Sequence, residues 1–484
     1  MTSPSARGPG DLVPQPRAAI RVGEALAAAG HPLWLVGGSV RDAVIGRRTH
    51  DLDFTTSARP EQVLALTASI AATTWTAGIE FGTVGVLVDG ERCEITTYRA
   101  DRYDRVTRNP EVVFGESLLE DLRRRDFTMN AMAVRVSQDP AEREFVDPFG
   151  GFADLARGLL RTPGDPVESF ADDPLRILRA ARFASTLGVT VPDDVRDAMT
   201  QLAPELARIT AERVQVELSK LLLGAHPRQG LELLVDTGAA DVVLPELPAL
   251  RMAADEHGQH KDVYAHTLQV LEQAIAKEAT YTGGEPDLVL RLAALLHDIG
   301  KPATRRFESG GRVTFHHHEV VGKKQTQARL QALRFPKDVI KDVSKLVFLH
   351  LRFYGYGRGE WTDSAVRRYV TDAGPLLPKL SALVRSDSTT RNKRKAATLD
   401  ATYDALEERI ETLKAQEELD SIRPDLDGHQ IMTLLPELKG RAIGEAYQHL
   451  LGLRMEHGPL GEEAARAALL AWWASRESAD PDPS

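Results

Sequence analysis

A glycine turn directly after a short apolar run constrains the N-terminal part of this chain more than any other feature. Residues 32–36 have the composition of a buried strand, and Gly37 and Gly38 follow at once. Two glycines allow a tight turn and close approach of the backbone to a polyphosphate, and a helix starting near Ser39 would point more N–H groups at it. Arg41 can add a bidentate contact to phosphate oxygens. We therefore predict a phosphate-binding unit that includes Gly38 and Arg41.

Two acidic residues follow nine positions later in a segment with strand character. Asp51 and Asp53 alternate along residues 50–55, so a strand would place both carboxylates on one face. Paired carboxylates suit Mg²⁺, which prefers oxygen ligands and bridges to substrate phosphates. An Asp-x-Asp pair alone also fits a solvated edge strand. The glycine turn just upstream favours the metal site, and together the two features predict nucleotidyl transfer.

Five motifs in one order resemble a known family, the class II tRNA nucleotidyltransferases and bacterial poly(A) polymerases. They are Leu-Val-Gly-Gly-Ser-Val-Arg-Asp from residue 35, Asp-Leu-Asp from 51, Arg-Arg-Asp-Phe-Thr-Met-Asn-Ala from 124, Asp-Pro-Phe-Gly-Gly from 147 and Asp-Pro-Leu-Arg from 173. The remainder of the chain, with an HD-type helical region, is similar to the actinobacterial CCA-adding branch.

The resemblance and the residue pattern together predict an α+β chain with a polymerase-β-like nucleotidyltransferase head. Helical and strand patterns alternate up to about residue 160, with strands near 33–36, 51–55, 83–88 and 92–98, and helical spacing dominates afterwards. We expect five parts: a disordered tail (1–15), the head (16–160), a helical neck for nucleobase selection and RNA binding (161–250), an HD-type helical domain (251–390) and a helical C-terminal tail (391–484).

The activity that the resemblance implies is template-independent addition of C, C and A from CTP and ATP to the tRNA 3′ end, with release of pyrophosphate. Asp51 and Asp53 would be the catalytic Mg²⁺ ligands. Glu94 would be either a further carboxylate of this site or the partner of a nearby arginine. A poly(A) polymerase, which shares the head motifs, and a metal phosphohydrolase acting on RNA ends are the alternatives.

The third motif supplies further candidates. Arg125 matches the nucleotide-binding arginine of the family, and Asp126 is expected to fix that arginine or its neighbour. We expect Phe127 in the core. Asn130 would either cap a turn or contact the ribose.

A helix expected to start near Asp172 would select the base. Three residues apart on a helix, Asp173 and Arg176 would present an acceptor beside donors, matching the amino group and ring nitrogen that cytosine and adenine share. The resemblance adds Arg179 and Arg182 as nucleotide contacts. An arginine-rich surface helix paired with Asp172 and Asp173 is the alternative. Many relatives have Glu at the position of Asp172, which leaves Asp173 as the candidate base reader.

A second constellation follows the order of the HD metal-phosphohydrolase motif. His266, the adjacent His297 and Asp298, and Asp387 would hold a second divalent metal, with His318 as a further ligand. Hydrolysis of phosphomonoesters or 2′,3′-cyclic phosphates would suit such a site. The alternative is an HD fold that binds RNA without turnover.

Composition limits the cellular setting. A single cysteine, Cys93, excludes an internal disulfide framework and fits a reducing cytoplasm. No apolar run approaches the roughly 20 residues of a membrane span. The net charge of −10 does not exclude RNA, because phosphate contacts depend on where cations cluster, here 123–125, 176–182 and 391–395. We expect tRNA, CTP and ATP as partners and no membrane.

Overall fold

The computed structural model consists of two compact units, Met1–Pro245 and Glu246–Ser484. Within them it describes residues 9–47, 51–102, 111–115, 117–252, 262–308, 313–353, 362–388, 393–417 and 422–477. The first unit contains a seven-stranded sheet and the second is helical, so the mixed α+β fold class is confirmed. Within these described residues no helix is long and apolar enough to span a membrane.

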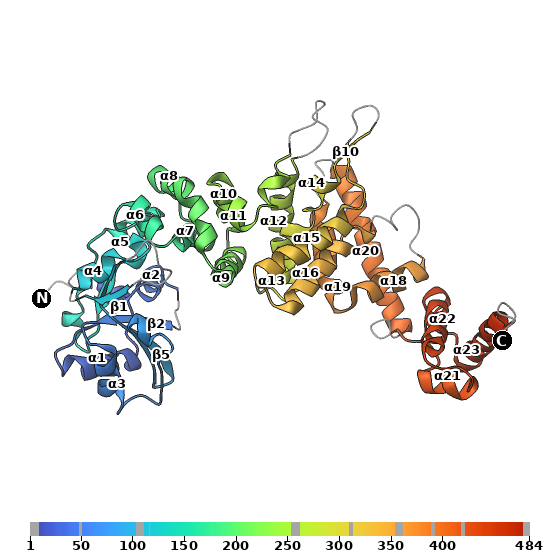
Figure 1. The fold of residues 1–484 in the computed structure, drawn as a ribbon, viewed down its shortest axis with the longest axis horizontal. Coiled ribbons are helices and arrows are strands. Elements are labelled where there is room, and N and C mark those ends of the chain that lie inside the picture. Colours follow the sequence, from blue (N-terminus) through green and yellow to red (C-terminus); the bar gives the residue numbers. More distant parts are fainter. Residues whose placement is uncertain are drawn as a thin grey trace, which may run out of the picture. The chain divides into compact units, whose positions relative to one another are not determined.

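The head is built on one mainly antiparallel sheet (Figure 1) with the strand order β3-β4-β5-β2-β1-β8-β9. The bounds are β1 (Leu33–Val36), β2 (Asp51–Thr56), β3 (Thr73–Trp75), β4 (Thr83–Val88), β5 (Glu91–Thr97), β8 (Ala133–Arg135) and β9 (Phe145–Val146). The pair β2/β5 is parallel. A separate hairpin is formed by β6 (Arg99–Arg102) and β7 (Glu111–Phe114). The four predicted strands correspond to β1, β2, β4 and β5.

Apolar faces of helices and of the sheet form the core of the head. Helices α1 (Arg17–Ala27), α2 (Gly38–Val44) and α3 (Pro60–Thr67) contribute, and Leu26, Leu35, Phe54 and Ile95 are among its fully buried members. The expected tail needs correction. Residues 1–8 lie outside the described residues, but Pro9–Leu12 forms a short 3₁₀-helix, Val13 is 1% exposed and Gln15 donates a 2.7 Å hydrogen bond to the Arg135 carbonyl oxygen. The folded head therefore begins before residue 16.

Helices complete the first unit. They are α4 (Leu118–Arg123), α5 (Gly151–Arg157), α6 (Pro166–Asp172), α7 (Leu175–Leu187), α8 (Asp193–Leu202), α9 (Ala211–Leu222), α10 (Pro227–Asp236) and α11 (Ala239–Val243). The helix expected near Asp172 is α7, and it starts only at Leu175. Asp173 has an extended backbone, as the following Pro174 favours, and so ends α6. Apolar residues of α7 pack between α9 and α10.

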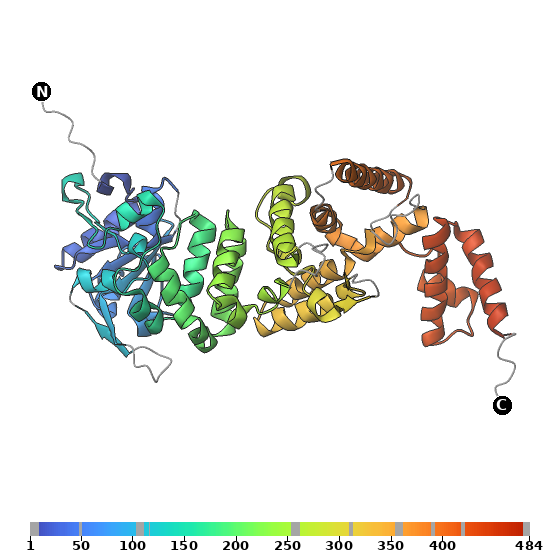
Figure 2. The same cartoon turned by 90° about the horizontal axis from the view of Figure 1, so that it is seen from above.

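The second unit is almost entirely helical. Its elements are α12 (Val263–Tyr281), α13 (Leu288–Leu296), α14 (Lys301–Thr304), the short hairpin β10/β11 (Arg306–Phe307 and Val313–Thr314), α15 (His318–Ala332), α16 (Lys337–Leu349), α18 (Asp363–Ala373), α19 (Leu377–Asp387), α20 (Lys393–Gln416), α21 (Gly428–Leu434), α22 (Arg441–His457) and α23 (Glu462–Glu477). The last three pack together (Figure 2) around a core of their own that includes Ile431, Leu450 and Leu469.

Candidate functional site

The glycine turn, one predicted carboxylate and one predicted arginine meet at a single point of the head. Gly37 has φ +69° and ψ −136°, a conformation that residues with side chains rarely adopt. A Cβ placed there would lie 3.1 Å from Arg125 Nη1 and 3.9 Å from Asp53 Oδ2. A side chain at residue 37 would therefore intrude on both groups. Gly38 begins α2 directly behind this turn.

The register of β2 and β5 places two carboxylate residues side by side. Asp53 is the direct partner of Glu94 in the parallel ladder, so their side chains leave the same face of the sheet. The backbone N–H of Asp53 donates a 3.1 Å hydrogen bond to Ser39 Oγ, which ties β2 to α2. The backbone of Asp51 begins β2, but its side chain lies outside the described part. Oxygen ligands of this kind fit a hard divalent cation.

Asp121, which sequence reasoning missed, holds both arginines of the third motif. Its Oδ2 accepts from Arg125 Nη2 at 3.1 Å, and its Oδ1 accepts from Arg124 Nη2 at 2.9 Å. Burial opposes the charged form, but Arg125 and Arg124 together hold the pKa of Asp121 below its ordinary value. The expectation that Asp126 fixes these arginines was wrong. The available signal was the spacing: Asp121 lies three and four residues before Arg124 and Arg125, which directly follow the helix that contains it.

Asp126 instead connects the third motif to α7. It accepts hydrogen bonds from Arg179 Nε at 2.8 Å and from Asn130 Nδ2 at 2.9 Å. Burial alone would raise the pKa of Asp126, but Arg179 and these hydrogen bonds lower it to about 2. Asn130 also accepts from Arg41 Nη1 at 2.7 Å through its Oδ1. One chain of hydrogen bonds therefore runs from Arg41 on α2 to Arg179 on α7.

Three predicted arginines surround one aromatic ring. The Cζ atoms of Arg41, Arg179 and Arg182 lie 5.0, 5.7 and 4.3 Å from the centroid of Phe183. Phe127, fully buried as expected, meets the same ring edge-on at 5.6 Å. Burial and the neighbouring Arg179 lower the pKa of Arg182 to about 10. The structure therefore gathers three guanidinium groups where α2 meets α7.

Asp173 and Arg176 are not paired as the sequence suggested. Arg176 is 8% exposed, and its guanidinium donates to Ser169 Oγ at 2.7 Å and to the Arg124 carbonyl oxygen at 2.6 Å. The Asp173 carboxylate accepts from Arg213 Nη2 at 3.0 Å. The reason is that Asp173 precedes α7 instead of lying on it. Arg213, from α9, was not predicted.

The predicted HD residues come together in the second unit. His266 Nε2 lies 3.0 Å from Asp387 Oδ1, and His297 Nε2 lies 3.1 Å from Asp298 Oδ2 and 3.5 Å from Asp387 Oδ1. These side chains come from α12, the end of α13 and the end of α19. Ligand atoms of His266, His297 and Asp387 lie within 4.8 Å of one another, a spacing that a metal ion could occupy.

A second group of ligands shares this centre. Atoms of Asp298, His318 and His350 also lie within 4.8 Å of one another, and His318 Nε2 is 3.3 Å from Asp298 Oδ1. His350 was missed. It directly follows the apolar end of α16 (residues 346–349), just as His297 follows the apolar α13, and this repeated pattern was a usable signal.

Backbone carbonyls fix the orientation of three histidines. Nδ1 of His297, His318 and His350 lies 2.8, 2.8 and 2.6 Å from the carbonyl oxygen three residues earlier, which assigns the proton to Nδ1. The Nε2 atom of each is therefore buried and faces the cluster, and those of His297 and His318 lie 3.1 and 3.3 Å from the Asp298 carboxylate. Metal-binding histidines are commonly oriented this way. Burial also lowers the pKa of His350 to about 4, which keeps that ring neutral.

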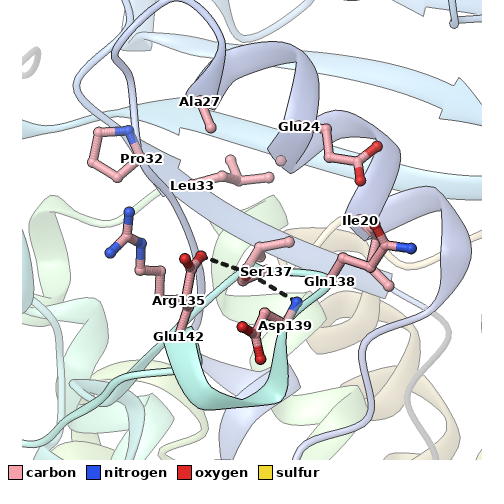
Figure 3. Close-up of a pocket in the computed structure, with 12 residues that line it drawn as sticks. Ile20, Glu24, Ala27, Pro32, Leu33, Arg135, Ser137, Gln138, Asp139 and Glu142 are labelled. Atoms are coloured by element: carbon pink, nitrogen blue, oxygen red, sulfur yellow. Dashed lines mark hydrogen bonds between the residues drawn. The ribbon is translucent and has the colours of Figure 1, made fainter.

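A separate pocket of the head, with a volume of about 460 Å³, contains none of these residues. It lies between α1 and the segment that follows β8 (Figure 3), where Ser137 Oγ bonds to both Glu142 and the Asp139 backbone. Its lining combines the acids Glu24, Asp139 and Glu142 with Arg135. The pocket therefore does not belong to the candidate site.

Three family models match successive parts of the chain. Residues 33–161 match "Poly A polymerase head domain", residues 188–250 match "Probable RNA and SrmB- binding site of polymerase A", and residues 263–389 match "HD domain". The first model covers the glycine turn, β2 and the Asp121–Asn130 region. The third covers all six residues of the histidine and aspartate cluster.

Individual relatives match over different lengths. The chain is 44% identical to a CCA-adding enzyme of Leuconostoc mesenteroides over 209 residues, which are 43% of this chain and 50% of that protein. It is 41% identical to a CCA-adding enzyme of Levilactobacillus brevis, of which it covers 61%. The chain thus spans about half to three fifths of these curated relatives. An A-adding tRNA nucleotidyltransferase of Deinococcus radiodurans is 33% identical over 90% of this chain and 95% of that protein.

Solved structures give the same picture. The crystal structure of the Bacillus stearothermophilus CCA-adding enzyme in complex with CTP matches with a TM-score of 0.64 and 26% identity, covering 96% of this chain and 99% of that one. The same family is indicated by the motifs, by the head site and by a relative that is similar along nearly the whole length. The chain therefore belongs to the family of tRNA nucleotidyltransferases and poly(A) polymerases.

Proposed function

We propose that this protein adds C, C and A from CTP and ATP to the 3′ end of tRNA. The observation that carries the proposal is the convergence of Arg125, Asp53 and the backbone of Gly37, with Glu94 beside Asp53 in the sheet. A triphosphate needs cations and a close backbone, and its metal needs carboxylates. The names of the relatives support tRNA as the substrate and C and A as the added nucleotides. A cytoplasmic location is part of the proposal, because tRNA is its substrate.

In the proposed reaction the RNA 3′-hydroxyl attacks the α-phosphorus of the nucleotide. A bond forms between that oxygen and phosphorus, the bond to the β-phosphate oxygen breaks, and pyrophosphate leaves. Arg41 and Arg125 hold the triphosphate by its negative oxygens, and the Gly38 backbone allows its close approach. Asp51 and Asp53, supported by Glu94, would hold Mg²⁺. When bound, Mg²⁺ supplies neutralisation of the charge that develops on the phosphates.

Base selection is assigned to the head–neck junction. Asp173 would accept a hydrogen bond from the amino group of cytosine or adenine, and a guanidinium beside it would donate to the ring nitrogen. Arg213 stands 3.0 Å from Asp173 and is now a candidate for that guanidinium. Arg176 could take this role only after releasing Ser169 and the Arg124 carbonyl. Arg179 and Arg182 remain nucleotide contacts in the proposal.

The full-length similarity to an A-adding enzyme favours a second candidate, addition of the terminal A alone. The deciding experiment supplies tRNA lacking CCA and tRNA ending in CC, each with CTP, ATP or both, and sequences the product ends. Addition of CCA to the first substrate supports our proposal. Addition of A only to the CC end indicates an A-adding enzyme, and long ATP-dependent tails indicate a poly(A) polymerase.

We also propose that the HD-type domain binds divalent metal and hydrolyses phosphoesters at RNA ends. Support comes from three buried Nε2 atoms that face two aspartates. His266, His297 and Asp387 would hold one ion and His318 and His350 another, with Asp298 reaching both. Imidazole and carboxylate ligands together suit Mn²⁺ or Ni²⁺, and such ions, when bound, would activate water for attack on phosphorus.

Separate variants test the two activities. Asp53→Ala is expected to abolish nucleotide addition and to leave hydrolysis of 2′,3′-cyclic nucleotides intact, whereas Asp298→Ala is expected to do the opposite. Loss of nucleotide addition in Asp298→Ala alone would contradict the assignment of the head. Unchanged hydrolysis in Asp298→Ala would contradict the assignment of the second site.

The division into a head that ends near residue 160, a neck (161–250), an HD-type domain (251–390) and a tail (391–484) remains part of this proposal. The boundary between the two compact units, after Pro245, supports a neck that ends near residue 250. Residues 391–392 lie outside the described residues, so their proposed RNA contact rests on sequence alone.

A further inference from the structure

A groove with an excess of positive charge lies on the second unit, apart from the metal cluster. It has a volume of about 600 Å³, and it is lined by residues of α15 and α16 together with Arg352 and with Asp372 of α18. Five cations border it, Lys323, Lys337, Lys341, Lys345 and Arg352. Asp372 is the one acid of the lining, and it lies 3.4 Å from Arg352. In a chain with a net charge of −10, this local excess does not follow from composition.

Three of these lysines form a row along one helix. Lys337, Lys341 and Lys345 are four residues apart on α16, so successive ammonium groups are displaced by about 6 Å along the helix axis. Among the residues that the structure describes, none of the three has an acidic partner. Lys337 is also the first residue of α16, where the helix dipole disfavours a cation. Asp338 and Asp342 lie three positions before Lys341 and Lys345, but within the described residues they form no ion pair with these lysines. Ion pairing within α16 therefore does not account for the row.

The floor of the groove is apolar and contains an aromatic ring. Ile340 and Leu349 are buried there, and Phe348 is partly exposed. The Phe348 ring lies 4.9 Å from Lys323 Nζ and 5.8 Å from Arg352 Cζ. An aromatic surface bordered by cations is what unpaired bases and their phosphates require. A compact anion would need converging cations, whereas a row of cations suits an extended polyanion.

We propose that the groove between α15 and α16 binds the backbone of the substrate RNA. The inference rests on the proposed function in one respect, that the substrate is an RNA. It concerns residues outside the arginine-rich segments that the sequence singled out, and outside the six metal-site residues. Lys337, Lys341 and Lys345 contact successive phosphates, and Phe348 supports a base or ribose.

Binding of a labelled tRNA transcript that lacks CCA to the full chain, measured at several KCl concentrations, tests the proposal. Lys337→Ala/Lys341→Ala is expected to weaken binding roughly ten-fold at about 0.15 M salt. The slope of the logarithm of the binding constant against the logarithm of the KCl concentration is expected to become shallower by about 1.5 to 2. Both lysines are exposed, so folding should not change. Lys277→Ala/Lys324→Ala removes the same charge from α12 and α15 outside the groove and is expected to leave the salt dependence unchanged. Lys337→Arg/Lys341→Arg is expected to restore binding.

Two outcomes would contradict the proposal that the groove binds RNA. One is unchanged affinity and salt dependence in Lys337→Ala/Lys341→Ala, or an equal loss in the control pair. The other is loss of binding to a polyglutamate peptide with RNA binding intact, which would indicate an acidic protein partner. If the wild-type chain adds no nucleotide but the groove variant still loses RNA affinity, the proposed nucleotide addition is contradicted. RNA binding by the groove is then still supported.

Discussion

Arg41 and Asn130 are joined by a 2.7 Å hydrogen bond from guanidinium Nη1 to amide Oδ1, and Asn130 passes the connection on to Asp126. The Asn130 side chain therefore orients Arg41, the arginine that we propose to bind the triphosphate. Loss of a hydrogen bond to a charged group costs roughly 1.5–3 kcal/mol. We expect Asn130→Ala to raise the KM for CTP and ATP about ten-fold or more, with little change in tRNA affinity.

Steady-state kinetics with each nucleotide check this prediction. Gln138→Ala removes an exposed amide elsewhere in the head and serves as the control. A fall in kcat alone, with KM unchanged, would show that Asn130 does not act through triphosphate binding.

The buried Asp126 makes the head sensitive to acid. Its pKa in the folded protein is lowered to about 2, below the ordinary value of 3.8, so ionised Asp126 stabilises the fold at pH values above about 4. That contribution, roughly 2 kcal/mol by proton linkage, is lost as the pH falls from about 4 towards 2. Asp126→Asn is expected to remove this part of the acid sensitivity while destabilising the head at pH 7.

Calorimetry of the full chain at pH 5, 4 and 3 measures the effect. Asp139→Asn, an exposed acid of the same head, is expected to keep the wild-type slope. An identical pH slope in Asp126→Asn and the wild type would show that the Asp126–Arg179 pair does not contribute.

Sequence patterns predicted those features that depend on neighbouring residues. The apolar run before Gly37 and the strand pattern at 83–88 identified β1 and β4. The order of His266, His297, Asp298 and Asp387 identified the second cluster. The motifs also indicated the family. The actinobacterial branch and the roles of the site residues stay predictions.

Features that depend on tertiary packing were missed. The strands β3, β8 and β9 have only two or three residues each, too few for a visible alternation. Arg213 reaches Asp173 across 40 positions of sequence because α9 packs against α7. Pro174 also moved the start of α7, which separated Asp173 from Arg176. Contacts of this kind, between residues far apart in the sequence, cannot be predicted from a local sequence pattern.

Asp173 is expected to be a determinant of base choice. Replacing it by Ala removes the acceptor for the amino group of cytosine, and a mismatched polar contact is worth about 1–3 kcal/mol. We expect the preference for CTP over UTP to fall about 10- to 100-fold in Asp173→Ala. The ratio of kcat/KM values for the two nucleotides measures this, with Asp193→Ala on α8 as the control. An unchanged ratio would remove Asp173 from base selection.

The last prediction concerns His350, whose ring nitrogen faces Asp298 and His318. Wild-type protein saturated with Mn²⁺ or Ni²⁺ is expected to retain two ions, one for each group of ligands. His350→Gln keeps the polarity and approximate size of the side chain but weakens the second group, so we expect about one ion. Metal analysis after dialysis of the full chain measures the stoichiometry, and circular dichroism checks the fold. His449→Gln, in α22, is the control and should retain both ions. Two ions in His350→Gln would show that His350 is not a ligand, because a residue that binds a buried cation through one nitrogen cannot be replaced without loss of affinity.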